Sequence, residues 1–136
     1  MTENERTEEL KNAESIDLAR AAVKLLLIKK GIDVKMYDVK EYTSITDFYV
    51  NVTARSSTHV GALADDLAED FANKGANALR VEGKRGNSWI LIDFGSLIVN
   101  VFDSASRSFY NFDRLLPQET QRDVSDIEAE VDKQFE

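Results

Sequence analysis

Stretches with the apolar spacing of a helix and short runs with the pattern of a β-strand follow one another along the chain. This order constrains the fold more than any other feature of the sequence. Over residues 16–30 apolar side chains recur every three or four positions, which is typical of one face of a helix. Lys29, Lys30 and Gly31 end this stretch, and cations before a glycine are typical of a helix C-terminus. We therefore expect a first helix that ends near Lys30, with Gly31 supplying the left-handed backbone that often follows.

A second helical pattern covers residues 57–73, and short β-like runs surround it. Ser56, Ser57 and Thr58 offer hydroxyl caps for its start. Short glycine-containing joints favour antiparallel hairpins between the later runs, whereas the 57–73 helix favours a crossover between parallel strands. The sequence thus predicts an α/β (α+β) fold, with helices packed on a mixed sheet of about five strands. The expected strands are 32–38, 48–52, 79–82, 89–93 and 97–102, and residues 106–110 are expected to form a short connector.

Charge divides the chain into three segments. Residues 1–15 carry five acids and two bases, residues 118–136 carry seven and two, and residues 16–117 carry thirteen of each, so the net charge of −8 lies in the two ends. We expect a charged lead-in over 1–15, one domain over 16–117 and a solvated acidic tail beyond Pro117. A weak amphipathic helix that docks on the domain or on a partner is the alternative for the tail, because apolar residues recur there at helical spacing: Val124, Ile127, Val131 and Phe135.

Composition excludes several classes of function. With 17 Lys+Arg against 25 Asp+Glu, the chain lacks the basic excess of a general nucleic-acid binder, so little direct nucleic-acid binding is expected. Cysteine is absent and His59 is the single histidine, which argues against a bound metal, a cofactor held by thiolates and a histidine-based catalytic pair. The lack of a long apolar run and the acidic start predict no membrane span and no targeting signal, hence a soluble cytoplasmic protein.

Carboxylates offer the one enzymatic alternative. Nucleotidyl transfer needs acids on adjacent strands that share divalent cations. Its usual sign is Gly-Ser on a turn, followed by two acids one residue apart. Gly95-Ser96 and Asp103 fit, but Ala105 stands where the second acid belongs. A magnesium-dependent, nucleotidyltransferase-like enzyme that uses Asp93 and Asp103 is kept as the alternative function.

The basic loop over residues 83–86 is a weaker candidate for phosphate binding. Phosphate-cradling loops normally lead into a helix N-terminus. Here a strand beginning at Trp89 is expected to follow, so we interpret the loop as a hairpin turn with a solvated basic tip, Lys84 and Arg85.

The candidate binding site is a group of aromatic, apolar and polar residues in and after the last two runs. Strand alternation places Trp89, Leu91 and Asp93 on one side. Such a face is either core beneath a helix or a flat docking surface, and periodicity does not distinguish the two. We assign partner binding to Trp89, Leu91, Asp93, Asn100 and Phe102, with Arg107 and Tyr110 beside them.

Several segments taken together resemble one known family. They are Asp38-Val39, Tyr42–Val50, Ser57 with His59-Val60, Ala62–Ala64, Glu82-Gly83, Trp89–Gly95 and Arg107–Leu115. In order and spacing these segments resemble the ribosomal silencing factor family, also called Iojap, and the resemblance covers roughly residues 16–116. It implies a fold similar to that of nucleotidyltransferases without the transferase site.

The resemblance also implies a function that is not enzymatic. Family members bind the large ribosomal subunit through its fourteenth protein, on the face that meets the small subunit. They thereby block subunit joining and lower translation when nutrients are short. Homodimers occur in the family, so a possible homodimer is expected, and a homodimeric scaffold without a ribosomal role is a further alternative.

Two positions depart from the family pattern. Asn100 stands where a histidine is usual, and Leu116 stands where a tryptophan is usual. Asparagine keeps a hydrogen-bonding side chain without a titratable ring, whereas leucine removes a large amphipathic anchor. Both changes fall in or next to the segments that carry the candidate site.

Overall fold

The computed structural model of the chain describes residues 6–83 and 86–135. Lys84 and Arg85, the expected basic tip of a hairpin, lie outside the described residues. Within the described part, no helix is long and apolar enough to cross a membrane. The elements are α1 (Ser15–Ile28), β1 (Ile32–Asp38), β2 (Phe48–Thr53), α2 (Ser57–Asn73), β3 (Arg80–Glu82), β4 (Trp89–Asp93), β5 (Leu97–Phe102), α3 (Ser104–Tyr110), the 3-10 turns η1 (Phe112–Leu115) and η2 (Gln118–Thr120), β6 (Gln121–Arg122) and α4 (Ser125–Gln134).

The strands form one mixed sheet in the order β3-β4-β5-β2-β1-β6. β2 and β5 pair in parallel and the other neighbours pair antiparallel, which confirms the predicted fold class and hairpins. The sheet has six strands rather than the expected five or so. The missed strand, β6, pairs Gln121 with Tyr37 and Arg122 with Met36, and its two residues are too few to show an alternating pattern.

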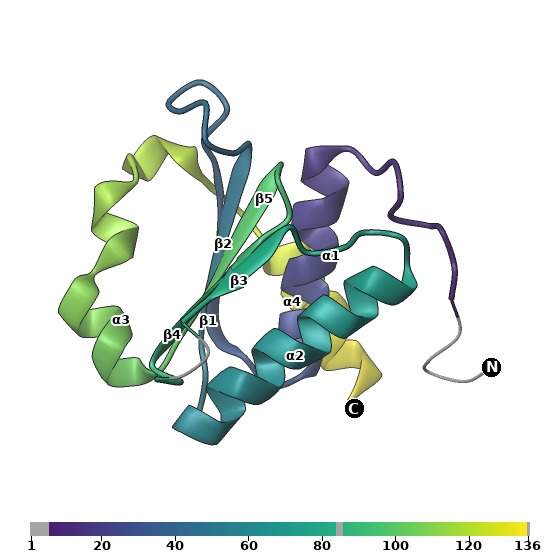
Figure 1. Cartoon of the computed structure of the whole chain (residues 1–136). Helices are drawn as coiled ribbons and strands as arrows, with labels where there is room; N and C mark the ends of the chain where they lie inside the picture. The colour runs from purple at the N-terminus through teal and green to yellow at the C-terminus, as the bar shows by residue number, and fades with distance from the viewer. Residues whose placement is uncertain (1–5, 84–85, 136) are drawn as a thin grey trace.

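Two unequal layers enclose the sheet. Figure 1 shows α1, α2 and α4 on one face, and α3 with the turn that follows it on the other. The three-helix layer closes the hydrophobic core, whose burial is the main stabilising term for a domain of this kind. The sheet contributes alternate residues to this core, among them Val50, Val52, Ile90, Ile92, Val99 and Val101, and the helices contribute Val23, Leu26, Leu63, Leu67 and Phe71.

The end of α1 differs from expectation in its detail. The helix ends at Ile28, and Lys30 rather than Gly31 takes the left-handed backbone, with φ 72°. Gly31 is required for another reason: a Cβ there would lie 2.6 Å from Val52 Cγ2 and 2.9 Å from the Leu26 carbonyl oxygen. Glycine therefore permits the close approach of this turn to β2.

His59 ties the start of α2 to the end of α1. The Ser56 hydroxyl caps α2 by accepting a hydrogen bond from the His59 backbone N–H at 3.1 Å. The His59 ring accepts at Nδ1 from the Arg55 backbone N–H at 2.8 Å, and its Nε2 lies 2.9 Å from the Lys29 carbonyl oxygen. The single histidine is thus engaged at a helix junction.

The described part of the charged lead-in, residues 6–14, is packed against the domain. The backbone N–H groups of Thr7 and Leu10 donate to the carbonyl oxygens of Asn73 and Lys74, at 2.6 and 2.8 Å. Leu10 is buried and joins the core. These contacts fix the segment along the end of α2.

The expectation of a solvated acidic tail is wrong for residues 118–135. β6 extends the sheet, and α4 buries Ile127 and Val131 in the core together with the preceding Val124. The docked amphipathic helix, which the spacing of apolar residues allowed, is the correct alternative. Composition misled here because an acidic helix can still bury one apolar stripe.

Two acidic residues of α4 have partners on α1. Asp126 forms an ion pair with Arg20, and Glu130 Oε1 lies 2.7 Å from Lys24 Nζ. These pairs are exposed, so each contributes little by itself. Their consequence is orientation, since they align the two helices with the apolar stripe of α4 facing inward.

We expect Ile127→Ala to lower the free energy of unfolding by about 2–4 kcal/mol, because the truncated side chain leaves a cavity under α4. Urea denaturation followed by far-ultraviolet circular dichroism measures this loss. The control, Glu128→Ala, changes the exposed neighbour and should alter the free energy by less than about 0.5 kcal/mol. Equally small losses for both variants would mean that α4 does not pack on the domain.

Candidate functional site

The second face of the sheet carries the residues that the sequence singled out. The register of β4 and β5 places Trp89 opposite Phe102 and Leu91 opposite Asn100. Residues directly opposite each other in neighbouring strands point to the same side of a sheet, so these four side chains share a face. Alternation within the strand already places Trp89 and Leu91 together. β2 continues this face through Asn51, which lies beside Asn100.

Helix α3 covers part of this face, where the sequence predicted only a short connector. Asp103 caps the helix, its Oδ1 accepting from the Ser106 backbone N–H at 2.7 Å. The helix ends at Tyr110, and the following Asn111 adopts the left-handed conformation with φ 51°. The seven residues of α3 are too few for a helical repeat of apolar residues, which is why the pattern missed it.

Coverage by α3 removes part of the predicted binding site from the surface. Asn100 and Phe102 are fully buried, and Arg107 is 8% exposed. A partner that docks on the folded chain therefore does not reach Asn100 or Phe102, and their assignment as direct contacts is revised. Asn100 and Phe102 therefore belong to the core beneath a helix, which was the other interpretation of this face.

A chain of hydrogen bonds runs across this buried face. Trp89 Nε1 donates to Asn100 Oδ1 at 3.0 Å, and Asn100 Nδ2 donates to Asn51 Oδ1 at 3.0 Å. Asn51 Nδ2 then donates to Asp113 Oδ1 at 2.9 Å. Each side-chain amide acts as both donor and acceptor, so the chain connects β4 to η1 through β5 and β2. Buried polar groups satisfied in this way fix a unique arrangement of their elements.

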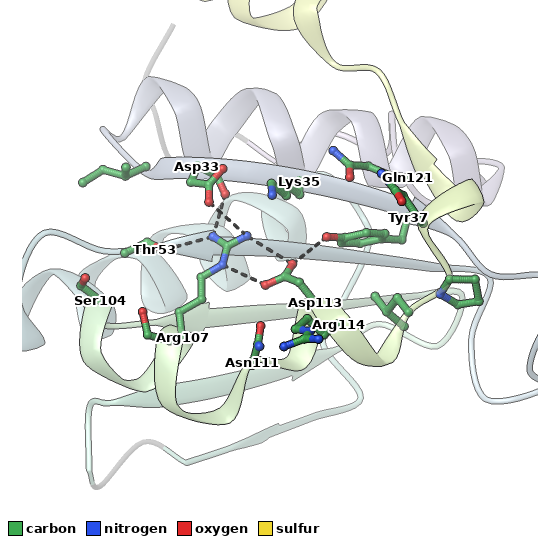
Figure 2. Close-up of a pocket in the computed structure, with 15 residues that line it drawn as sticks. Asp33, Lys35, Tyr37, Thr53, Ser104, Arg107, Asn111, Asp113, Arg114 and Gln121 are labelled. Carbon is green, nitrogen blue, oxygen red and sulfur yellow. Dashed lines mark hydrogen bonds and ion pairs between the residues drawn. The ribbon is translucent and has the colours of Figure 1, made fainter.

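Asp113 is the acceptor on which three elements converge. Besides the bond from Asn51, it accepts from the Tyr37 hydroxyl at 2.8 Å and from Arg107 Nε at 3.0 Å (Figure 2). Arg107 in turn donates from Nη1 to the Asp33 carbonyl oxygen at 2.6 Å and to Thr53 Oγ1 at 3.0 Å. A buried guanidinium is costly unless its donors are paired, and here they are paired on both sides.

This arrangement shifts two pKa values in opposite directions. Burial alone would raise the pKa of Asp113, but hydrogen bonds from Arg107, Asn51 and Tyr37 outweigh it and hold the pKa below its ordinary value of 3.8. Burial, followed by the hydrogen bond to Asp113, raises the pKa of Tyr37 above its ordinary value of 10.0. Both groups therefore stay in their hydrogen-bonded forms at neutral pH, with Asp113 charged and Tyr37 neutral.

The remaining predicted residues lie at the surface as an aromatic cluster with an apolar and an acidic neighbour. Trp89 is partly buried, and its ring lies 4.9 Å from that of Phe102 and 5.0 Å from that of Tyr110. Tyr110 is 53% exposed, and Phe109, which the sequence analysis did not select, is 80% exposed. Leu91 and Asp93 are partly buried further along β4, the strand that begins at Trp89. We name Trp89, Leu91, Phe109 and Tyr110 the aromatic surface.

A small hollow lies beside the aromatic surface. It has a volume of about 210 Å³ and is lined by Glu82, Gly83, Trp89 and Leu91. Gly83 has φ 88°, and a Cβ there would lie 2.1 Å from the Trp89 carbonyl oxygen, so only glycine fits this turn.

The carboxylates of the enzymatic alternative are not brought together. Asp93 pairs with Ile98 at one end of the β4–β5 hairpin, whereas Asp103 follows Phe102 at the other end. Asp93 Oδ1 accepts from the Gly95 backbone N–H at 2.8 Å, and its Oδ2 lies 3.3 Å from Arg80 Nε. Across residues 6–83 and 86–135, no group of three or more potential metal ligands is found.

Leu116, the second departure from the expected pattern, lines an apolar groove. The groove measures about 370 Å³, and its other walls include Tyr42, Tyr49, Phe112 and Leu115. Leu115 is 74% exposed at its rim. Leucine thus keeps this region apolar without filling it with a large ring.

Sequence reasoning missed Asn51, Asp113 and Tyr37 as parts of the site. Asn51 is the one polar residue between Val50 and Val52, which is a readable signal for a buried, hydrogen-bonded amide. Asp113 and Tyr37 lie 76 residues apart, and nothing in the local pattern indicates that they meet.

Comparison with known proteins agrees with this architecture. A family model described as "RsfS: Ribosomal silencing factor during starvation" matches residues 12–136. The ribosomal silencing factor RsfS of Haemophilus influenzae is 35% identical over 86 residues, covering 63% of this chain and 84% of that protein. The chloroplastic protein Iojap of Zea mays is 28% identical over 116 residues, covering 79% of this chain and 49% of that protein. A crystal structure from Chromobacterium violaceum superposes with a TM-score of 0.74 at 27% identity, covering 76% of this chain and 87% of that one.

We expect Asp113→Asn to lower the free energy of unfolding at pH 7 by about 3 kcal/mol, because it leaves the buried Arg107 without its carboxylate. The variant should also change the pH dependence. The folded pKa of Asp113 lies below the unfolded value, so its stabilisation is complete above pH 3.8 and is lost as pH falls through the folded pKa.

Urea denaturation of both proteins between pH 7 and pH 2 tests this expectation, and the difference between them should narrow in the acid range. Asp132→Asn, which removes an exposed carboxylate on α4, serves as the control and should follow the unmodified protein throughout. A constant difference between Asp113→Asn and the unmodified protein at every pH would contradict the assignment.

Proposed function

The chain belongs to the ribosomal silencing factor family, and from this membership we propose that it represses translation at the large ribosomal subunit. In this proposal it binds in the cytoplasm to the fourteenth large-subunit ribosomal protein, on the face that meets the small subunit. The bound protein excludes the small subunit sterically. No chemical step is needed, in keeping with a family that is named for silencing rather than for a reaction.

The aromatic surface is the observation that supports docking on a protein. Trp and Tyr are enriched among residues that dominate protein–protein binding energies, because they bury large area at low conformational cost. Phe109 at 80% exposure and Tyr110 at 53% offer such area, and their rings lie 5.0 Å apart. Exposed aromatic side chains in contact with one another form a continuous apolar patch, and such patches are typical of surfaces that bind a partner.

Charge favours a protein partner over ribosomal RNA. The chain carries a net charge of −8, and Glu82 lines the hollow beside the aromatic surface. An overall negative charge repels the phosphate groups of RNA and attracts basic proteins, and ribosomal proteins are commonly basic. The acidic ends would then speed encounter with a basic protein.

The hydrogen-bond chain from Trp89 to Asp113 would keep the aromatic surface preorganised. Trp89 is held by its bond to Asn100 and by the Phe102 ring beneath it. A surface that is already ordered loses less entropy on binding. In this view Asn100, Phe102 and Arg107 contribute to docking as positioning residues.

We expect Phe109→Ala to weaken binding to the large subunit about tenfold or more, while its free energy of unfolding changes by less than about 1 kcal/mol. Co-sedimentation with purified large subunits measures binding, and a subunit-joining assay measures repression. Phe109 is a better probe than Trp89, because Trp89→Ala also removes a hydrogen bond and ring contacts and so should destabilise the fold.

The control is Leu79→Ala, which removes a similarly exposed apolar side chain just before β3. It should leave binding and subunit joining unchanged. Co-sedimentation with small subunits alone, or unimpeded joining at saturating protein, would overturn the proposed function. Self-association through the same surface would appear as a dimer that Phe109→Ala dissociates, measured by light scattering.

A further inference from the structure

A polar pocket lies on the opposite side of α3 from the aromatic surface and is not used by the proposed function. It measures about 810 Å³, within the usual range for small-molecule sites. β1, the α3–η1 segment and the chain leading into β6 form its walls (Figure 2). The residues of the aromatic surface do not line it.

The charged residues of this pocket leave a positive excess in an acidic protein. Its lining includes three cations, Lys35, Arg107 and Arg114, and two carboxylates, Asp33 and Asp113. Both carboxylates face Arg107: Asp113 Oδ2 lies 3.0 Å from its Nε, and Asp33 Oδ2 lies 3.8 Å from its Nη2. The two carboxylates exceed Arg107 by one negative charge, so with Lys35 and Arg114 the lining carries a net charge of +1.

Lys35 and Arg114 have no such partners. Among the residues that the structure describes, neither side chain makes a hydrogen bond or an ion pair. Figure 2 shows them on opposite sides of the Arg107–Asp113 pair, Lys35 from β1 and Arg114 from η1. Lys35 is partly buried, and its pairing with Asn51 of β2 fixes the position of its backbone.

The pocket walls between these cations are polar and firmly supported. Asn111 lies at the end of α3 in a left-handed conformation, and Asp33 on β1 is also left-handed, with φ 51° and 52°. The Asp33 backbone turns its carbonyl oxygen toward Arg107, which pins the wall of β1 to α3. Gln121 and Tyr37, paired across β6 and β1, supply further hydrogen-bonding groups.

We propose that this pocket binds a small phosphate-bearing molecule whose phosphate group contacts Lys35 and Arg114, the two lining cations without a carboxylate partner. Two unpaired cations from different elements suit a dianion, because a charge-assisted hydrogen bond from each side fixes the group. The polar walls suit the hydroxyl and amide groups of the rest of the molecule. A phosphate in an RNA backbone is disfavoured, because the overall negative charge opposes an extended polyanion.

Nuclear magnetic resonance titration of the isotope-labelled full chain tests this site. Adenosine monophosphate and inorganic phosphate are the probes, and adenosine is the matched ligand without phosphate. We expect saturable amide shifts at Lys35, Asn111 and Gln121 with both phosphate probes, at concentrations up to about 10 mM. Lys35→Gln and Arg114→Gln should each weaken binding about fivefold or more. Lys133→Gln, which removes an exposed cation on α4, should leave it unchanged.

Several results would overturn the proposal. They are the absence of saturable shifts with either phosphate probe, equal shifts with adenosine, and affinities that neither pocket variant alters. Binding of a short single-stranded RNA with no binding of adenosine monophosphate would assign the cations to RNA instead. Dispersed amide resonances show that a variant is folded. Because the two substitutions lie on separate elements, one folded variant is enough for the test. The titration uses no ribosome, so its failure leaves the proposed function standing, and failed co-sedimentation leaves this site standing.

Discussion

The hydrogen bonds to Asp113 hold together everything on the second face of the sheet. One carboxylate accepts from Tyr37 on β1, Asn51 on β2 and Arg107 on α3. Through Asn51 and Asn100 it is connected to Trp89 on β4. A buried donor that lacks its acceptor costs free energy, because it has lost its hydrogen bonds to water. The elements that carry these donors must therefore take up their positions together. The positions of α3, the aromatic surface and the polar pocket all follow from this one acceptor.

One face of the sheet provides most of the stability of the protein, and the other fixes the geometry of its surface. The face under α1, α2 and α4 is apolar and supplies stability through burial. The opposite face uses paired polar groups, which contribute less to net stability but fix geometry. Such a division suits a protein whose proposed action is to present a surface of fixed shape. This division also explains why the sequence pattern assigned Asn100, Phe102 and Arg107 to partner binding although they lie beneath that surface.

The charge of the two ends shows which structural properties composition can predict. The sequence places the net charge of −8 in the two ends, and that arithmetic stands. The inference that an acidic end is solvated failed for α4, since Asp126 and Glu130 pair with α1 while its apolar residues Ile127 and Val131 are buried. Helical spacing was the better guide there than charge, because spacing reports which residues share a face and charge does not.

Local patterns determined the helices over 57–73 and near 16–28, the longer strands and the sharing of one face by Trp89 and Leu91. These features depend on residues close in sequence, whose spacing fixes the direction of each side chain. Only the tertiary structure decided which face α3 covers, that β6 completes the sheet, and that Tyr37 and Asp113 meet. Those outcomes depend on contacts between residues far apart in the chain. Such contacts arise when donors, acceptors and apolar stripes from separate elements satisfy one another, which no single segment encodes.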